Sequence, residues 1–371
     1  MKVLIINSVC GIGSTGKICG AQAEEYAAQG HEVTIAYGRD GTVPERYKPF
    51  ARRICSDMDV KVSALRTRLL DDHGFANAQT TRKFLEWAES YNPDLLWLHN
   101  IHGYYIHVGL LFDWIKSRPQ MQVKWMLHDC WAFTGHCAHF SFAGCGRWKT
   151  GCYNCPEKGS YPASSLWDNC RGNYLRKKAA FTGVKDMTLI VPSKWLGDLV
   201  RQSFLGAYPV EVQYHSVNTD VFRPTPGNFR EKHGLEDKTI ILGVASVWTD
   251  RKGLKDFYEL DKLTDDNTKI VLVGLTEKQI DQLPGNILGI TRTHDARELA
   301  EIYTAADVFV NPSREETFGL TTLEAICCGT PAIVYRDTAC EEVVSQYGGI
   351  AVEPNHQAIA GAVKVLLSQP R

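Results

Sequence analysis

The feature that most constrains the fold is an alternation, along the whole chain, of short apolar runs with amphipathic stretches of helix length. Strands that alternate with helices predict a parallel sheet covered by helices on both faces. In the first half, the predicted strands are residues 2–6, 32–37, 94–98, 123–127 and 187–191, and the predicted helices include residues 15–29, 82–90 and 108–117.

The second half of the chain repeats this pattern after a break. Its predicted strands are residues 239–245, 269–273, 307–311 and 331–335, and its predicted helices are residues 254–263, 296–305, 318–328 and 357–368. The break is the PTPG sequence at residues 224–227, which interrupts regular structure. With 371 residues the chain is long enough for two cores. We therefore predict an α/β protein of two doubly wound, Rossmann-like domains, residues 1–216 and 217–371.

Two such domains that face each other leave a central cleft lined by the carboxyl ends of their strands, where parallel sheets bind ligands. The balance of 41 Lys and Arg against 42 Asp and Glu argues against a nucleic-acid partner. Two local basic clusters are interpreted as solvated surface, with a site for anionic lipid or phosphate as the alternative. They are Arg52, Arg53, Lys61, Arg66 and Arg68, and further along Arg171, Arg176, Lys177 and Lys178.

The amino-terminal apolar run is too short for the core of a signal peptide and leads directly into glycines. No window approaches the roughly 18 apolar residues that a membrane span requires. We therefore expect a cytoplasmic protein.

The strongest candidate site is the sequence SREETFGLTTLEAICCGTPAIVY at residues 313–335. It places Glu316 and Glu324 on either side of a helix start at Phe318, Gly319 and Leu320. Backbone N–H groups and the positive end of the helix dipole at such a start suit a diphosphate. Glu316 precedes the turn, and Glu324, two turns further along, can accept hydrogen bonds from ribose hydroxyls.

This sequence resembles the E-x7-E signature of retaining glycosyltransferases of family 4, which have the GT-B fold. The resemblance implies that Glu316 contacts the hydroxyls of the donor sugar and Glu324 those of the ribose. It also implies that Phe318, Gly319 and Leu320 offer their backbone to the diphosphate of a UDP- or GDP-sugar. In this resemblance the first domain is the acceptor side and the second binds the nucleotide sugar.

A second candidate element is GVASVWTDRKGL at residues 243–254. Lys252, together with Arg251, can neutralise the donor phosphates and stabilise the charge on the departing nucleotide. The family usually has an Arg six residues before the Lys, whereas this sequence has Ser246 there. Arg251 is the candidate to replace it, and a solvated basic turn is the alternative.

A third candidate is WMLHDCW at residues 125–131, a strand that ends in His128 and Asp129. A His at the carboxyl end of a buried strand can hydrogen-bond a donor or acceptor hydroxyl, and the family has a functional His at the corresponding position. His99 occupies a similar strand end.

The opening glycine loop contains Gly11, Gly13 and Gly16 in the sequence GIGSTGK. These residues match the start of a Walker A phosphate loop, but Ile18 stands where Ser or Thr must bind magnesium. We therefore interpret the loop as a flexible start of the first helix. In GT-B enzymes that loop faces the acceptor and the donor phosphates.

The segment at residues 130–172 fits neither pattern and is rich in Gly, Cys and aromatic residues. Cys137, Cys145, Cys152 and Cys155 include a CxxC pair, and four thiolates predict a structural zinc site; reduced, packed cysteines are the alternative. The segment also resembles the HD-x-W stretch of bacterial exopolysaccharide glycosyltransferases of the colanic-acid type, which implies surface polysaccharide assembly.

Together these features predict a retaining glycosyltransferase that moves a sugar from a nucleotide-diphosphate sugar to a glycan or lipid-linked acceptor, without a metal at the donor site. A lipid-linked acceptor would bring the protein to the inner face of the membrane as a peripheral protein. The alternative is a non-catalytic nucleotide-sugar-binding subunit of a polysaccharide assembly complex. Ser246 and the early end of the chain relative to the family favour that alternative.

Overall fold

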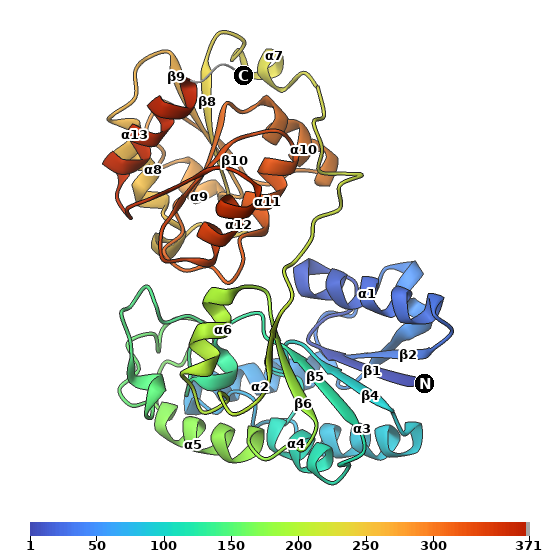
Figure 1. Ribbon diagram of the computed structural model, residues 1–371. Helices are drawn as coiled ribbons and strands as arrows, with labels where there is room; N and C mark the ends of the chain where they lie inside the picture. The colour runs from blue at the N-terminus through green and yellow to red at the C-terminus, as the bar shows by residue number, and fades with distance from the viewer. Residues whose placement is uncertain (369–371) are drawn as a thin grey trace. The chain divides into compact units, whose positions relative to one another are not determined.

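The computed structural model describes residues 1–368 and divides the chain into two compact units (Figure 1). Residues 1–192 and 196–213 form the N-terminal unit, whereas residues 193–195 and the chain from residue 214 onward form the C-terminal unit. The predicted boundary after residue 216 lies next to this division. The assignment of residues 193–195 to the C-terminal unit has no counterpart in the sequence pattern.

The N-terminal unit contains a seven-stranded sheet in the order β3-β2-β1-β4-β5-β6-β7, and every pair in it is parallel. The strands are β1 (Lys2–Asn7), β2 (Glu32–Tyr37), β3 (Ala51–Arg53), β4 (Leu95–Leu98), β5 (Gln122–Met126), β6 (Met187–Val191) and β7 (Val210–Val212). β1 lies inside the sheet and is buried from Val3 to Asn7, which explains its continuous apolar sequence.

Helices cover both faces of this sheet. They are α1 (Gly13–Ala28), α2 (Asp57–Leu70), α3 (Ala78–Tyr91), α4 (Val108–Lys116), α5 (Cys170–Phe181) and α6 (Lys194–Arg201), with short 3-10 helices at η1 (Glu45–Phe50), η2 (Trp131–Phe133) and η3 (Arg147–Lys149). In Figure 1, α3, α4 and α5 lie together on one face and α1 on the other. The strand order runs one way from β1 to β3 and the other way from β4 to β7. Because crossovers between parallel strands are right-handed, the connecting helices of these two halves cover opposite faces of the sheet.

The C-terminal unit contains a six-stranded parallel sheet in the order β10-β9-β8-β11-β12-β13. Its strands are β8 (Thr239–Val244), β9 (Thr268–Val273), β10 (Ile287–Ile290), β11 (Val308–Asn311), β12 (Ala332–Tyr335) and β13 (Ile350–Val352). Its helices are α7 (Phe229–His233), η4 (Asp250–Lys252), α8 (Leu254–Asp261), α9 (Glu277–Ile280), α10 (Ala296–Ala305), α11 (Leu320–Cys327), α12 (Ala339–Tyr347) and α13 (His356–Leu367). Two buried clusters pack on its opposite faces, one with Phe257 and Ile359 and one with Ala300 and Val344.

Each sheet has a point at which its strand order reverses, between β1 and β4 in the first and between β8 and β11 in the second. Ligands of open α/β sheets bind outside the carboxyl ends of the strands at such a point. We therefore expect ligands at two groups of loops, those that follow β1, β4 and β5 and those that follow β8 and β11.

The predicted α/β class, with two doubly wound Rossmann-like domains, is confirmed. All nine predicted strands are present with small shifts at their ends, whereas the sequence pattern missed β3, β7, β10 and β13. These four are the outermost strands of the two sheets. An edge strand of three or four residues is only partly buried, as Ala51–Arg53 and Val210–Val212 are, and so has no continuous apolar run to reveal it.

The segment at residues 130–172 is held by aromatic packing. The rings of Phe133, Phe140 and Trp148 lie with their centroids 4.8–6.2 Å apart. All three side chains are buried, together with Trp131. A loop of this length without periodicity therefore has a small core of its own.

Lys177 does not belong to the solvated basic cluster in which the sequence placed it. Its side chain is fully buried, and its Nζ donates to the carbonyls of Trp131 at 2.8 Å and Thr134 at 3.1 Å. The ammonium also lies 3.5 Å from the centroid of the Trp131 ring. Burial lowers the pKa of Lys177 to about 7.

Among residues 1–368, no helix combines the length and apolar character needed to cross a bilayer.

Candidate functional site

The loop after β8 is fixed against the loop after β11. The Thr249 hydroxyl accepts a hydrogen bond from the Lys252 backbone N–H at 3.4 Å, which closes the short helix η4. Gly253 follows with φ +77°, and a Cβ there would lie 2.4 Å from the carbonyl oxygen of Pro312. Only glycine allows the two backbones to approach this closely.

Charged side chains and backbone hydrogen bonds link the same two loops. The Lys252 ammonium forms an ion pair with the carboxylate of Glu316, and both side chains are about one fifth exposed. The Arg251 Nη1 donates to the carbonyl of Glu315 at 2.9 Å, and the Arg314 backbone N–H donates to the carbonyl of Arg251 at 2.9 Å. The structure thus brings together Arg251, Lys252 and Glu316, which the sequence proposed on separate motifs.

The start of α11 follows directly. Gly319 has φ +94° and precedes the first helical residue, Leu320, so no capping side chain covers the first amide groups. A Cβ on Gly319 would lie 2.4 Å from the Cys340 Sγ, which makes glycine necessary for packing as well as for conformation. The buried ring of Phe318 packs against Tyr214 and His215 and anchors this turn.

Glu324 lies on α11, and a hydrogen bond from a buried tyrosine orients its carboxylate. The hydroxyl of Tyr303, on α10, donates to the Glu324 Oε2 at 3.0 Å. The Tyr303 side chain is fully buried, and the Glu324 carboxylate is partly exposed. A carboxylate held in one direction by a buried donor is suited to accept hydrogen bonds from a ligand.

In the N-terminal unit, His128 follows β5 and His99 follows β4. The His99 Nδ1 lies 3.1 Å from the His128 Nε2, and the two rings stack with centroids 5.3 Å apart. The other nitrogen of His99 lies 3.0 Å from the Oε1 of Gln22 on α1. The two sequence-predicted histidines are therefore neighbours at one edge of the sheet, since β4 and β5 pair in parallel.

The glycine loop lies at this edge too, because it connects the end of β1 to α1. The Gly11 N–H donates to the carbonyl of Gly16 at 3.1 Å, and Gly11 has φ +72°. A Cβ on Gly11 would lie 2.3 Å from the ring of Tyr47. Gly13 has φ +62°, but a Cβ there would meet no atom of residues 1–368 within 4 Å. Gly13 therefore begins α1 with open space in front of it.

Sequence reasoning missed a chain of polar side chains beside His128. The Tyr161 hydroxyl lies 3.2 Å from the His102 Nδ1, and the His102 Nε2 lies 2.9 Å from the Oδ2 of Asp129. The Trp131 backbone N–H donates to the other oxygen of Asp129 at 2.9 Å. Burial raises the pKa of Asp129, but the charge and hydrogen bond of His102 outweigh it and hold that pKa below its usual range.

Two of these three residues had a signal in the sequence. Asp129 stands next to the predicted His128, and His102 lies three residues after His99 at the same strand end. Tyr161 had none, because it comes from the irregular segment and reaches the chain only through the fold.

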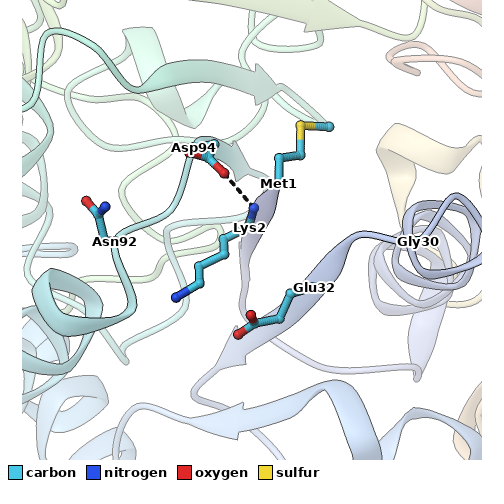
Figure 2. Close-up of a pocket in the computed structure, with 6 residues that line it drawn as sticks. All are labelled: Met1, Lys2, Gly30, Glu32, Asn92 and Asp94. Atoms are coloured by element: carbon cyan, nitrogen blue, oxygen red, sulfur yellow. Dashed lines mark hydrogen bonds between the residues drawn. The ribbon is translucent and has the colours of Figure 1, made fainter.

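A surface hollow at the opposite end of the N-terminal sheet is lined by Lys2, Glu32, Asn92 and Asp94 (Figure 2). Lys2 and Glu32 stand at the starts of β1 and β2, and Asp94 precedes β4. Figure 2 shows the hydrogen bond from the Lys2 N–H to the Asp94 Oδ2, at 2.7 Å. The hollow thus lies at the amino ends of the strands, away from the edge where such sheets bind ligands.

The predicted zinc site at Cys137, Cys145, Cys152 and Cys155 is not supported. Within residues 1–368, no group of three or more His, Cys, Asp or Glu side chains is arranged to hold a metal. The Cys152 Sγ accepts a hydrogen bond from the Gly135 N–H at 3.1 Å, and Cys137 is hydrogen-bonded to Cys155, which lowers the pKa of Cys155. The aromatic core of Phe133, Phe140 and Trp148 orders part of this segment, and the alternative of reduced, packed cysteines fits this arrangement.

Comparison with known proteins gives a family match in the C-terminal unit. Residues 227–371 match the family model described as glycosyl transferases group 1. The chain is 24% identical over 268 residues to the putative colanic acid biosynthesis glycosyl transferase WcaC of Escherichia coli K12, covering 70% of this chain and 64% of that protein. It is 30% identical over 149 residues to the N,N'-diacetylbacillosaminyl-diphospho-undecaprenol alpha-1,3-N-acetylgalactosaminyltransferase of Campylobacter jejuni, covering 38% and 39%. The match spans less than two thirds of either relative.

Solved structures resemble the whole chain. Sucrose-phosphate synthase from Thermosynechococcus elongatus superposes with a TM-score of 0.71 at 19% identity, covering 100% of this chain and 90% of that one. Anabaena HepE in complex with UDP superposes with a TM-score of 0.67 at 13% identity, covering 99% and 90%. At these identities the likeness shows the fold alone, which is GT-B as predicted.

Proposed function

We propose that the protein is a glycosyltransferase with a nucleotide-diphosphate-sugar donor, from the premise that residues 227–371 match the family model described as glycosyl transferases group 1. The observation that carries the proposal is the contact between Lys252 and Glu316 beside the glycine start of α11. A cation, a carboxylate and uncapped helix amides then stand at the β8/β11 switch point. These groups fit a diphosphate that carries a sugar.

In the proposed reaction the donor diphosphate binds Lys252 and the backbone of Phe318, Gly319 and Leu320. Lys252 and the helix dipole stabilise the negative charge that develops on the departing nucleotide. Glu316, held by its ion pair with Lys252, orients the donor sugar. Catalysis comes from positioning and from electrostatic stabilisation, and no step on this route requires a metal.

Glu324 binds the ribose hydroxyls in this proposal, because the hydroxyl of Tyr303 orients its carboxylate. Arg251 acts as a positioning residue. Its guanidinium donates to the carbonyl of Glu315 at 2.9 Å and so holds the backbone next to Glu316.

The N-terminal unit supplies the acceptor side of the proposal. His128, stacked on His99, is the residue we assign to the acceptor hydroxyl, and Gly13 leaves open space at the start of α1. Asp129 and His102 extend this group with a second hydrogen-bonded pair. We expect retention of the anomeric configuration, which the resemblance to the E-x7-E signature implies. The configuration of the product, read by NMR, tests this part.

The comparisons suggest the substrate class. HepE was crystallised with UDP, whereas a relative that is 36% identical over 94 residues is named GDP-mannose-dependent, so we propose a UDP- or GDP-sugar as donor. The relatives are named for colanic acid biosynthesis and for transfer onto a diphospho-undecaprenol-linked sugar. We therefore propose a glycan or lipid-linked acceptor in surface polysaccharide biosynthesis, used on the cytoplasmic side of the membrane.

The first test is a thermal-shift screen with UDP, GDP, ADP, CMP and their sugar conjugates. We expect one nucleotide to raise the Tm of the wild type, and Glu324→Ala to abolish that shift. Glu277→Ala is the matched control, because this exposed glutamate lies on α9 of the same unit. No shift with any nucleotide, or an unchanged shift in Glu324→Ala, would contradict the donor site.

The second candidate function, a non-catalytic nucleotide-sugar-binding subunit, is favoured by one observation, Ser246 in place of the family's Arg. Donor turnover separates the two functions. A transferase slowly hydrolyses its donor without an acceptor, whereas a binding subunit shows the thermal shift but no hydrolysis. Hydrolysis that Lys252→Ala abolishes would exclude the binding-only function.

A further inference from the structure

Helix α2 of the N-terminal unit exposes its apolar side chains. Met58, Val62, Leu65 and Leu69 are exposed by 66%, 58%, 60% and 41%. Their spacing of four, three and four residues places them in one stripe along the helix. A surface helix of a globular protein normally turns such a stripe toward the core.

The opposite, buried face of α2 carries polar side chains where a core face normally carries apolar ones. The residues of this helix that are buried are Ser63 and Thr67, and both are polar. The Thr67 hydroxyl oxygen is buried and has no hydrogen-bond partner among residues 1–368. Burial of an unpaired hydroxyl costs stability, and exposure of four large apolar side chains forgoes stabilisation. This inverted pattern indicates that the stripe meets an environment other than water.

Two more exposed apolar residues lie in a loop that is bonded to the carboxyl end of α2. Leu166 and Trp167 are exposed by 66% and 65%. The Ser165 N–H donates to the carbonyl of Arg68 at 2.7 Å, which ties this loop to the last turn of α2. We call Met58, Val62, Leu65, Leu69, Leu166 and Trp167 the α2 apolar patch. A Trp side chain is favoured where an apolar phase meets water.

Beyond the first turn, where Asp57 pairs with Arg53 and Asp59 accepts hydrogen bonds from Ser56, cations border the α2 apolar patch on both sides of the helix. Lys61 and Arg68 lie on one side of the stripe and Arg66 on the other, and all three side chains are exposed. Arg66 pairs with Asp72, whereas Lys61 and Arg68 form no ion pair within residues 1–368. An apolar stripe between cations is complementary to a surface of anionic lipid, which offers phosphates above and acyl chains below.

We propose that the α2 apolar patch binds the surface of an anionic lipid bilayer, with Leu65, Leu69 and Trp167 inserted at the boundary between head groups and acyl chains. Lys61 and Arg68 then contact lipid phosphates. This binding rests on the proposed function through its lipid-linked acceptor, but it uses neither the donor site nor His128. A second copy of the chain fits less well, since a two-fold contact through the patch would set Lys61 and Arg68 against their own copies.

The test is co-sedimentation of the full chain with vesicles. One set consists of phosphatidylcholine alone and the other of equal parts phosphatidylcholine and phosphatidylglycerol. We expect binding to the anionic vesicles at low salt, weaker binding at high salt, and little binding to the neutral vesicles. Absence of binding to anionic vesicles at low salt would overturn the proposal.

Variants assign the binding to the patch. We expect Leu65→Ser with Leu69→Ser to lower the partition coefficient at least about tenfold, since each Leu loses an apolar contact with lipid. Lys61→Ala and Arg68→Ala are each expected to lower it about fivefold. The control is Leu263→Ser with Val365→Ser, which replaces apolar residues of the C-terminal unit that are exposed by 47% and 50%.

All these side chains are exposed, so the Tm of each variant should match that of the wild type and serves as the folding check. Trp167→Phe provides a direct reading, because the blue shift of fluorescence on anionic vesicles should shrink in that variant. Equal loss of binding in the control and patch variants would overturn the proposal. So would light scattering that shows a stable dimer which Leu65→Ser dissociates.

Discussion

The carboxyl edges of the two sheets are built in different ways. In the C-terminal unit, two neighbouring loops supply Arg251, Lys252 and Glu316, and the second loop runs straight into the helix that carries Glu324. In the N-terminal unit, Gln22, His99, His128 and Tyr161 come from four separate stretches of chain. The residues of the first edge can therefore be recognised as sequence motifs. The residues of the second edge are neighbours only because the strand order brings their separate stretches of chain together.

The chemistry of the two edges differs as well. The C-terminal edge places a lysine, a carboxylate and the start of a helix side by side, which suits a dianionic diphosphate. The N-terminal edge consists of stacked imidazoles and a Tyr161–His102–Asp129 chain, which suits neutral hydroxyls. This difference leads us to expect that substitutions at the first edge act on turnover and those at the second act more on stability.

The largest effect should come from Lys252→Ala, which we expect to lower donor turnover on the order of 10²–10³-fold, because the leaving diphosphate loses its cation. The matched control is Lys255→Ala, whose ammonium is exposed and pairs with Asp250. Steady-state kinetics with the donor found in the screen provide the measurement. If Lys252→Ala turned over the donor as fast as the control, Lys252 would not stabilise the charge on the leaving diphosphate.

Next in size is the effect of Asp129→Ala on folding. This change leaves His102 and the Trp131 N–H without their partner, and we expect a loss of about 3 kcal/mol in the free energy of unfolding. Asp198→Ala, which removes an exposed pair with Arg201, should cost less than about 1 kcal/mol. Urea unfolding of both variants provides the comparison, and equal costs would mean that the Asp129 chain adds no stability.

The same pair predicts a dependence on pH. The folded pKa of Asp129 lies below its ordinary value, so the unfolded state binds more protons as the pH falls. The stabilisation is therefore present above the unfolded pKa of about 4 and disappears as the pH falls below it. Asp129→Ala should lose less stability on acidification than the wild type, and parallel curves would contradict this expectation.

A smaller effect is the difference in stability cost between an alanine substitution at Gly319 and one at Gly13. Gly319→Ala combines a positive φ with a clash against the Cys340 Sγ, and we expect it to cost about 2–3 kcal/mol. Gly13→Ala has the positive φ but open space, so its expected cost is ~1 kcal/mol. Thermal unfolding of the two variants measures the difference. Equal costs would show that backbone conformation alone, without packing, sets the requirement at both positions.

The smallest effect should come from Tyr303→Phe. Loss of the hydroxyl removes the hydrogen bond to Glu324, and we expect a cost of ~1 kcal/mol in stability together with a smaller nucleotide-induced thermal shift. Tyr258→Phe, on α8, is the control. If the nucleotide shift stays the same while stability falls, Tyr303 supports the fold without orienting Glu324.

Much of the fold follows from local pattern. The inner strands are apolar along their whole length because helices cover both faces of each sheet, so β1 and β8 stand out in the sequence. The four edge strands do not, because they are short and only partly buried or pair on one side alone. Local sequence also fails to predict which charged side chains are buried. Lys177 belongs to a cluster of basic residues in the sequence, yet its ammonium is fully buried in the fold.

Helix α2 and the cysteine segment mark two further limits. The stripe of Met58, Val62, Leu65 and Leu69 has the period of a core-facing helix, and only the fold shows that it faces outward. Four cysteines with a CxxC pair suggested a metal, whereas the fold shows an aromatic core in this segment and no grouping of three metal-ligating side chains within residues 1–368. Periodicity and spacing describe what a segment can do, whereas its neighbours decide what it does.

By itself, the sequence determined the α/β alternation, the two Rossmann-like domains and the motif around Glu316 that we propose for the donor, because these depend on residues close together along the chain. The tertiary structure alone decided that Lys252 meets Glu316, that Tyr303 orients Glu324 and that Tyr161 joins His102 and Asp129. Such contacts join residues far apart in sequence, and the order of strands in each sheet sets them. That order depends on the packing of whole helices and strands, which no local pattern records.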